Sequence, residues 1–173
     1  MIFYQYIDSP FGEITLVSDE QHLLGLLFGH SLETRYTKRI AKLSKTLVED
    51  WKCGSATVIE DTKKQLLEYC EGKRQHFQLP LKLLGSEFQV SVWQALLAIP
   101  FGKTQSYKQI AATIGKPSAV RAVANANGAN AIAIIIPCHR VISSDGSIGG
   151  YSGGIDKKQA MLKIEGRELV KSD

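Results

Sequence analysis

Short apolar segments separated by turn residues predict that the chain begins with β-strands. Residues 1–7 are strand-like, residues 13–18 alternate between apolar and polar side chains, and residues 23–28 form another apolar run. Pro10 and Gly12 separate the first two segments, as turn residues do. The first third of the chain is therefore expected to form an antiparallel hairpin or meander.

Two helical patterns follow these strands. Residues 31–45 are rich in charge and roughly helical, and residues 57–72 place Leu66 and Cys70 on one helix face. Gly72 is typical of the residue that follows a helix end. The first part of the chain therefore combines strands with helices.

The segment at residues 73–85 shows neither the helix period nor the strand period and is expected to be irregular or extended. We place a domain boundary there. The sequence thus predicts an α/β domain at residues 1–84 and a mainly helical domain at residues 85–173.

Two capping boxes predict helix starts in the second domain. In a capping box, a Ser or Thr at the helix start is followed three positions later by Glu or Gln, and each side chain binds the other residue's backbone N–H. The pairs that fit are Ser86 with Gln89, and Ser106 with Gln109. The predicted helices run from 88 to 99 and from 107 to 114.

A further helix is predicted at residues 119–127, with Ser118 as its cap and Gly115 in the turn before it. Two short helices joined by such a turn form the helix-turn-helix pattern, which also occurs in helix pairs that only pack together. The second helix is rich in alanine, Ala122 among them, and Arg121 is its single charged residue. Such a smooth helix is suited to close approach to a duplex.

The rest of the chain contains an apolar segment, a loop and a last helix. Residues 131–137 are expected to form a buried strand or extended core segment, and residues 143–154 form a loop rich in Gly and Ser. Asp156 is the predicted cap of a helix at residues 157–165, which Gly166 ends.

Composition favours an ordinary globular protein. The chain has 173 residues, of which 44% are apolar and 22% charged. No run approaches the roughly 18 apolar residues of a membrane span, and the N-terminus lacks the pattern of a signal peptide. The three cysteines are widely spaced and indicate neither a disulfide framework nor a zinc site. We therefore expect a cytoplasmic protein without a metal or other cofactor.

The positive charge is concentrated in the second half of the chain. The formal net charge is +4; residues 1–84 contain 11 basic and 11 acidic side chains, and residues 85–173 contain 10 and 6. This excess is weak evidence for a polyanionic partner, because a solvated basic surface has the same composition.

Cys138 is the candidate nucleophile. It follows Pro137 at the end of the buried apolar segment and precedes His139 and Arg140. A free thiol with a pKa of about 8.5 is only a few per cent thiolate at neutral pH, so it needs a base or a positive charge nearby. A purely structural Pro-Cys-His-Arg turn is the alternative at this point. The other histidines are scattered without metal-ligand spacing.

Several motifs in one order resemble the C-terminal domain of the O6-alkylguanine-DNA alkyltransferases, also called methylated-DNA–protein-cysteine methyltransferases. They are FQVSVWQALLAIPFGKTQSYKQIA, RAVANANGAN, IIIPCHRVI, GGYSGG and KIEG, and they cover about residues 86–167. The N-terminal part resembles the family in size and in its hairpin-first layout. The resemblance implies a small α/β domain of ribonuclease-H-like shape followed by a DNA-binding domain with a helix-turn-helix.

The resemblance also implies a reaction. Members of the family bind duplex DNA through the minor groove, flip the damaged guanine into a pocket, and transfer its alkyl group irreversibly to a cysteine of their own. Each molecule reacts once. Here Cys138 matches that cysteine, His139 the residue that takes its proton through a water, and Glu165 the carboxylate that orients the histidine. Asn130 matches the asparagine that braces the site.

The remaining matches concern the base and the DNA. Tyr107 matches the tyrosine that assists the leaving guanine, and Arg121 the arginine that fills the vacated place in the base stack. The positions implied to line the base pocket are Val141, Tyr151 and Ser152. Ser118 and Ala122 are assigned, with Arg121, to the DNA-binding surface. Arg140 is interpreted as structural, and a monomer is expected.

Two other functions remain open at this level. A DNA-binding lesion sensor without chemistry would bind damaged DNA and leave Cys138 unmodified. A cysteine hydrolase based on Cys138 and His139 would show many turnovers per protein with an ester substrate.

Overall fold

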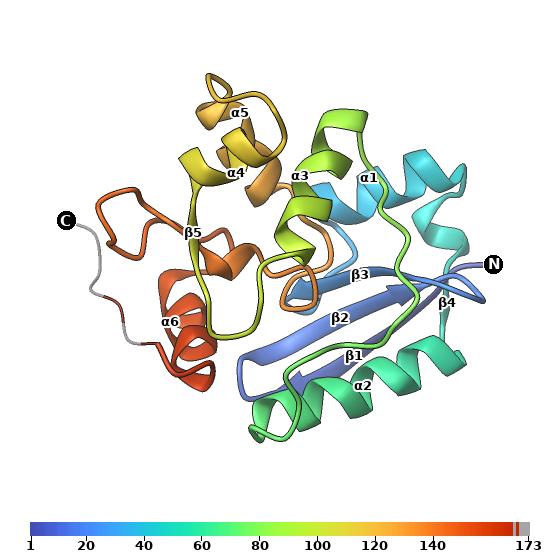
Figure 1. Cartoon of the computed structure of the whole chain (residues 1–173). Helices are drawn as coiled ribbons and strands as arrows, with labels where there is room; N and C mark the ends of the chain where they lie inside the picture. Colours follow the sequence, from blue (N-terminus) through green and yellow to red (C-terminus); the bar gives the residue numbers. More distant parts are fainter. Residues whose placement is uncertain (168, 170–173) are drawn as a thin grey trace. The chain divides into compact units, whose positions relative to one another are not determined.

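The computed structural model describes residues 1–167 and residue 169 (Figure 1). The chain divides into two compact units. The first unit consists of Met1–Gly85 together with Ala131–Ala133, and the second consists of Ser86–Asn130 together with the chain from Ile134 onward. The return of residues 131–133 to the first unit is a feature that the sequence pattern did not predict.

The sheet of the first unit is built on an antiparallel meander of three strands, which confirms the expectation from the apolar pattern. The strands are β1 (Phe3–Ser9), β2 (Gly12–Ser18) and β3 (Leu23–Phe28), and β4 (Lys52–Cys53) pairs parallel to β1. The strand order is β3-β2-β1-β4. Gly12, at the β1–β2 turn, has a φ of 90°, which glycine adopts without steric cost.

Two helices and a short 3₁₀ segment complete the first unit. They are α1 (Arg35–Ser44), η1 (Val48–Asp50) and α2 (Thr57–Cys70). α1 contacts β3 and α2 contacts β2. Every side chain from Ile14 to Ser18 of β2 is buried, and successive side chains of a strand point to opposite faces, so both faces of the sheet are covered there.

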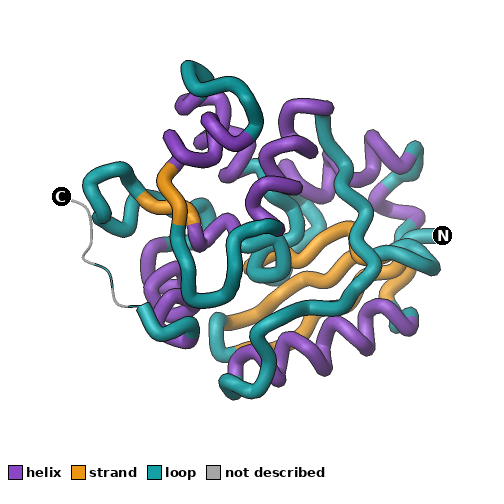
Figure 2. Tube along the Cα trace, viewed as in Figure 1, coloured by secondary structure: helices purple, strands orange, loops and turns teal. Residues whose placement is uncertain are grey.

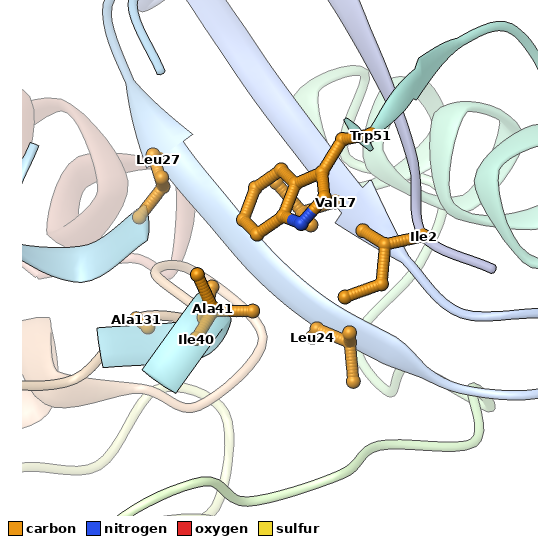
Figure 3. Packing of buried hydrophobic residues seen from close by; sticks show 8 residues of the cluster. All are labelled: Ile2, Val17, Leu24, Leu27, Ile40, Ala41, Trp51 and Ala131. Atoms are coloured by element: carbon orange, nitrogen blue, oxygen red, sulfur yellow. The ribbon is translucent and has the colours of Figure 1, made fainter. Parts of the chain in front are cut away.

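One apolar cluster between α1 and the sheet is shown in Figure 3. Val17 of β2 and Ile40 of α1 are both fully buried in it, and the indole of Trp51 is 6% exposed. The complete cluster contains Ile2, Val17, Leu24, Leu27, Ile40, Ala41, Trp51 and Ala131. Burying such side chains stabilises the fold by about 1.5–3 kcal/mol each.

The second unit is mainly helical (Figure 2). Its helices are α3 (Glu87–Leu97), α4 (Tyr107–Thr113), α5 (Val120–Gly128) and α6 (Ile155–Ile164). Both predicted capping boxes are present, because the Ser86 and Ser106 hydroxyls accept hydrogen bonds from the Gln89 and Gln109 backbone and the Gln side chains accept in return. α3, α4 and α5 contact one another.

Short elements connect these helices. The strands β5 (Gln105–Ser106) and β6 (Val141–Ile142) pair in parallel, and the 3₁₀ segment η2 (Cys138–Arg140) immediately precedes β6. The Trp93 indole N–H of α3 donates to the Ala126 carbonyl of α5 at 2.8 Å. η2 therefore lies in a unit whose helices are joined by both packing and hydrogen bonds.

Two predicted helix caps are wrong. Ser118 lies in the turn before α5, whose N-cap is Ala119 without a side-chain hydrogen bond. Ala119 has a ψ of 30°, outside the extended region that a capping residue normally adopts. Asp156 lies inside the first turn of α6, where its charge faces the positive end of the helix dipole, and Gly154 occupies the N-cap position.

The apolar segment at residues 131–137 is buried, as expected, but it is not a strand. Its single ladder contact pairs Ile132 with Leu26 of β3. Ile134 has a φ of 70°, a left-handed conformation that is rare for a β-branched residue and interrupts any extended run. The run of apolar residues predicts that this segment is buried. It does not predict the left-handed backbone conformation of Ile134.

Candidate active site

A tight turn presents Cys138. Pro137 has φ −81° and ψ 62°, the values of an inverse γ-turn, and the Cys138 N–H donates to the Ile136 carbonyl at 2.8 Å. The Arg140 N–H then donates to the Pro137 carbonyl at 3.0 Å and closes η2. Because a 3₁₀ helix has three residues per turn, Cys138, His139 and Arg140 point in three different directions.

Glu165, directly after α6, forms hydrogen bonds with two of these side chains, His139 and Arg140. Its Oε2 lies 2.6 Å from His139 Nε2, and its Oε1 accepts from Arg140 Nε at 2.8 Å. Arg140 Nη1 also donates to the Ile99 carbonyl at 2.6 Å. All three residues are buried. The carboxylate is thus compensated by a guanidinium and by an imidazole, as a buried charge requires.

Gly102 allows Glu165 to reach this position. Its N–H donates to Glu165 Oε1 at 3.3 Å. Gly102 has a φ of 77°, and a Cβ added there would lie 3.3 Å from the Glu165 carbonyl oxygen. The conformation and the space at this position both favour glycine.

His139 is held as a neutral base. Burial lowers the pKa of the fully buried imidazole, while the hydrogen bond and charge of Glu165 act in the opposite direction. A neutral ring whose Nε2–H donates to Glu165 leaves the lone pair on Nδ1. Within the described residues, Nδ1 is buried and has no hydrogen-bond partner. It is therefore available to accept a proton.

Cys138 is a protonated thiol in this environment. Its side chain is buried, and burial raises the pKa of the thiol. Hydrogen bonds with Asn130 and Tyr151 and the charge of Lys158 act to lower it. The sulfur lies 3.8 Å from the Tyr151 hydroxyl. A nucleophilic role for Cys138 therefore requires that a base remove the thiol proton during the reaction.

Cys138 opens onto a cavity of about 210 Å³ in the second unit. Its lining residues are Tyr107, Ala124, Asn127, Gly128, Cys138, Gly150, Tyr151 and Ser152. Burial raises the pKa of Tyr107, so its hydroxyl stays protonated and can donate a hydrogen bond. Asn130 stabilises the turn that presents Cys138, because its Nδ2 donates to the Ile136 carbonyl at 2.9 Å.

A larger cavity, of about 460 Å³, lies in the first unit between the β1–β2 turn and α2. The thiol that lines it belongs to Cys70, and burial and the charge of Glu71 raise the pKa of this thiol to about 11. A thiol of that pKa is almost entirely protonated at neutral pH. The smaller cavity, which Cys138 lines directly before the hydrogen-bonded His139–Glu165 pair, is the better candidate for chemistry.

The other residues selected from the sequence lie outside the cavity lining. Arg121, Ser118 and Ala122 are exposed around the start of α5. Val141 is fully buried in β6. The structure therefore brings the acceptor, base and pocket residues together and leaves the proposed DNA-contacting residues on the surface.

Sequence reasoning missed two polar residues. Lys158 of α6 is fully buried, and its Nζ donates to the Val141 carbonyl at 2.7 Å and the Gly150 carbonyl at 2.9 Å. Burial lowers the pKa of its ammonium to about 8. Asn127 Nδ2 donates to the Cys138 carbonyl at 3.4 Å. A less buried residue of the same type lies close to each of them in the sequence, Lys157 and Asn125, so no pattern distinguishes them.

The described residues contain no metal-binding group of side chains and no helix that could span a membrane. No group of three or more His, Cys, Asp or Glu side chains is arranged to hold a metal ion. No described helix combines the length and apolar character needed to span a membrane.

Two family models match almost the whole chain. The model described as 6-O-methylguanine DNA methyltransferase, ribonuclease-like domain, matches residues 2–83. The model described as 6-O-methylguanine DNA methyltransferase, DNA binding domain, matches residues 87–167. The two matches meet near the division between the two compact units.

Individual proteins agree with these models. The methylated-DNA–protein-cysteine methyltransferase of Methanosarcina barkeri is 44% identical over 97% of this chain and 99% of its own. The crystal structure of Mycobacterium tuberculosis O6-methylguanine methyltransferase is 42% identical, with a TM-score of 0.79 over 95% of this chain and 93% of that one. The structure of Mycobacterium tuberculosis OGT in complex with DNA is 41% identical, with a TM-score of 0.80 over 94% and 92%.

Proposed function

Because this chain belongs to the 6-O-methylguanine DNA methyltransferase family, we propose that it repairs DNA by moving an alkyl group from O6 of guanine to its own Cys138. The observation that carries the assignment is the buried His139–Glu165 pair directly after Cys138, which itself lines a cavity. The acceptor is the protein's own thiol, so each molecule acts once.

The chemical step is a displacement at the alkyl carbon. The Cys138 thiol gives its proton through a water to His139 Nδ1, and Glu165 stabilises the imidazolium that forms, as the acid does in other nucleophile–histidine pairs. The sulfur–carbon bond forms as the carbon–O6 bond breaks, and the bonding pair stays on the guanine. Release of the alkyl group from the resulting thioether would require a nucleophile to displace the thiolate, a poor leaving group, so the transfer is irreversible.

Tyr107 assists the leaving base. Its pKa is raised by burial, so the hydroxyl keeps its proton and faces the cavity that also contains Cys138. Charge develops on the purine ring as the carbon–oxygen bond breaks, and a hydroxyl donor that meets this charge lowers the barrier. Guanine then departs as the neutral base after taking a proton from the Tyr107 hydroxyl, and the proton that left the Cys138 thiol keeps the overall count in balance.

The guanine must leave the duplex to reach Cys138, because O6 lies inside the base stack. Flipping a base costs a few kcal/mol, and less for a weakly paired damaged base. Arg121 is exposed on α5 and is positioned to fill the vacated space, with Ser118 and Ala122 on the same surface. Tyr151 and Ser152, which line the cavity, form walls around the flipped base, whereas Val141 is buried outside that lining.

The DNA contact uses α4 and α5 as a helix-turn-helix in the minor groove, and the first unit has a ribonuclease-H-like shape. The protein acts as a monomer in the cytoplasm, on duplex DNA that contains O6-alkylguanine. The net charge of +4 is consistent with binding that is sensitive to salt and largely independent of sequence. The crystallised complex of the Mycobacterium tuberculosis relative with DNA supports DNA as the partner.

The Cys138→Ser variant tests this function. We expect it to bind a duplex with one O6-methylguanine as tightly as the wild type and to remove no methyl group. Equal transfer by the variant would contradict the assignment of Cys138. Many ester turnovers per wild-type molecule would instead favour a cysteine hydrolase, and binding without transfer by the wild type would indicate a lesion sensor.

A further inference from the structure

Two buried polar atoms of the second unit lack a hydrogen-bond partner among the described residues. They are Asn127 Oδ1 and His139 Nδ1. Asn127 is 6% exposed and His139 is fully buried. Buried polar groups are nearly always satisfied, and when no protein group serves them an ordered water usually does.

Both atoms belong to residues that are tied directly to Cys138. Asn127 Nδ2 donates to the Cys138 carbonyl at 3.4 Å, and Asn127 lines the cavity onto which Cys138 opens. His139 follows Cys138 in the chain. The two atoms that lack partners therefore belong to the residue that hydrogen-bonds the Cys138 backbone and to the residue that follows Cys138 in the chain.

The hydrogen bonds that Asn127 and His139 already make show that both of these atoms are acceptors. The Asn127 amide donates through Nδ2, so Oδ1 is an acceptor. His139 is neutral and bonds Glu165 through Nε2, so Nδ1 is also an acceptor. Two acceptors cannot satisfy each other, whereas one water, with two O–H donors, satisfies both.

We propose that Asn127 is a positioning residue for the thiol, because its Oδ1 and His139 Nδ1 together hold one water beside Cys138. With both hydrogens of the water engaged, its lone pairs are left for the Cys138 S–H. The thiol proton then passes to the water while a water hydrogen passes to Nδ1, which leaves a thiolate, a water and an imidazolium. This inference rests on the proposed function and assigns a role to a residue outside the Cys138–His139–Glu165 connection.

Asn127 differs from the titratable groups around this site because it carries no charge at any pH. The titratable and charged groups near Cys138 and His139 are Glu165, Arg140, Lys158, Tyr107 and Tyr151. Replacing any of these changes the local field. Replacing Asn127 by leucine, which has nearly the same shape, removes the acceptor and leaves the charges in place.

The experiment compares Asn127→Leu with Asn125→Leu, a matched control at an exposed position of the same helix. Single-turnover transfer from a duplex with one O6-methylguanine is followed across the pH range between the ordinary pKa values of histidine and cysteine. We expect transfer by Asn127→Leu to be about ten-fold slower at neutral pH, a fraction of what a full general base contributes. Its rate–pH profile should move upward, because hydroxide then replaces the oriented water.

A second readout uses the thiol alone. The rate of Cys138 carbamidomethylation by iodoacetamide, measured without DNA, should fall in Asn127→Leu at neutral pH and recover at alkaline pH. Asn125→Leu should match the wild type here. Asn127→Leu profiles that coincide with the wild type in both assays would overturn the role of Asn127. Failure of the wild type to transfer would instead overturn the proposed function.

A crystal structure of the wild-type protein gives an independent test, even if Asn127→Leu does not fold. We expect one water within hydrogen-bond distance of both Asn127 Oδ1 and His139 Nδ1, with Cys138 Sγ as its third partner. No water there, or separate waters on the two atoms, would contradict the proposal.

Discussion

At the scale of single residues, Glu165 is the link that gives His139 its role. Its two oxygens receive His139 Nε2 at 2.6 Å and Arg140 Nε at 2.8 Å, and its side chain is fully buried. Burial alone lowers the pKa of His139, and the carboxylate limits that fall. The base strength of His139 therefore depends on the charge of one neighbour.

Replacing Glu165 with glutamine removes the negative charge and keeps nearly the same side-chain shape. The imidazole then loses the interaction that raises its pKa, so this pKa falls further and the ring becomes a weaker base. We expect slower transfer, because the weaker base removes the thiol proton less well, and a rate–pH profile displaced to higher pH, because hydroxide then has to remove that proton. The buried Arg140 also loses its counter-charge, which should lower the free energy of unfolding by about 3–5 kcal/mol.

Single-turnover rates against pH and urea unfolding of Glu165→Gln check the two effects separately. Both are measured below the temperature at which the variant unfolds. An unchanged pH profile would exclude the connection between Glu165 and His139 as the source of thiol activation.

At the scale of elements, local signals predicted regular structure well. The alternation in residues 13–18 identified β2, and the two Ser–Gln pairs identified the starts of α3 and α4. These patterns depend only on residues that are close to one another in the sequence. The caps assigned to Ser118 and Asp156 failed because the backbone conformation beside them, which the side-chain types do not specify, moved the helix start.

The site was predictable only in part, for a related reason. Cys138, His139 and Glu165 were identified through family motifs, because 26 residues separate the histidine from the carboxylate and only tertiary structure joins them. Asn127 and Lys158 were missed because a buried polar side chain and an exposed one look the same in a helical sequence. Their burial follows from packing against elements distant in sequence.

Gly102 offers a prediction at this scale, since it sits in the connection between α3 and β5. Alanine there meets both a φ of 77° and the Glu165 carbonyl oxygen at 3.3 Å, so Gly102→Ala should lower the free energy of unfolding by about 1–3 kcal/mol and slow transfer. Gly146→Ala is the control, because Gly146 has a φ of 86° and open space around it. Equal effects of both variants on transfer would show that Gly102 does not position Glu165.

At the scale of the whole molecule, charge and chemistry lie in the same half of the sequence. The second half holds the entire net positive charge and also Cys138. Binding to DNA through phosphate contacts releases counterions, so affinity should fall linearly with salt on logarithmic axes. The reaction of the free thiol should be far less sensitive to salt.

A variant of Arg121 separates the effects of base flipping in DNA from those of the chemical step. It is exposed on α5, so Arg121→Ala should leave folding and the iodoacetamide reaction of Cys138 unchanged. Transfer from duplex DNA should fall, because the flipped-out guanine loses the side chain that replaces it in the stack. Single-turnover transfer measured beside thiol alkylation checks this, and equal losses in both assays would place Arg121 in the fold instead.

The most direct test of the account is intact-protein and peptide mass spectrometry after reaction with a duplex that carries one O6-methylguanine. We predict the mass of a single methyl group, located on the Cys138 peptide and saturating at one per protein however much DNA is added. An unmodified Cys138, or methylation of another residue, would contradict the assignment of this cysteine as the acceptor.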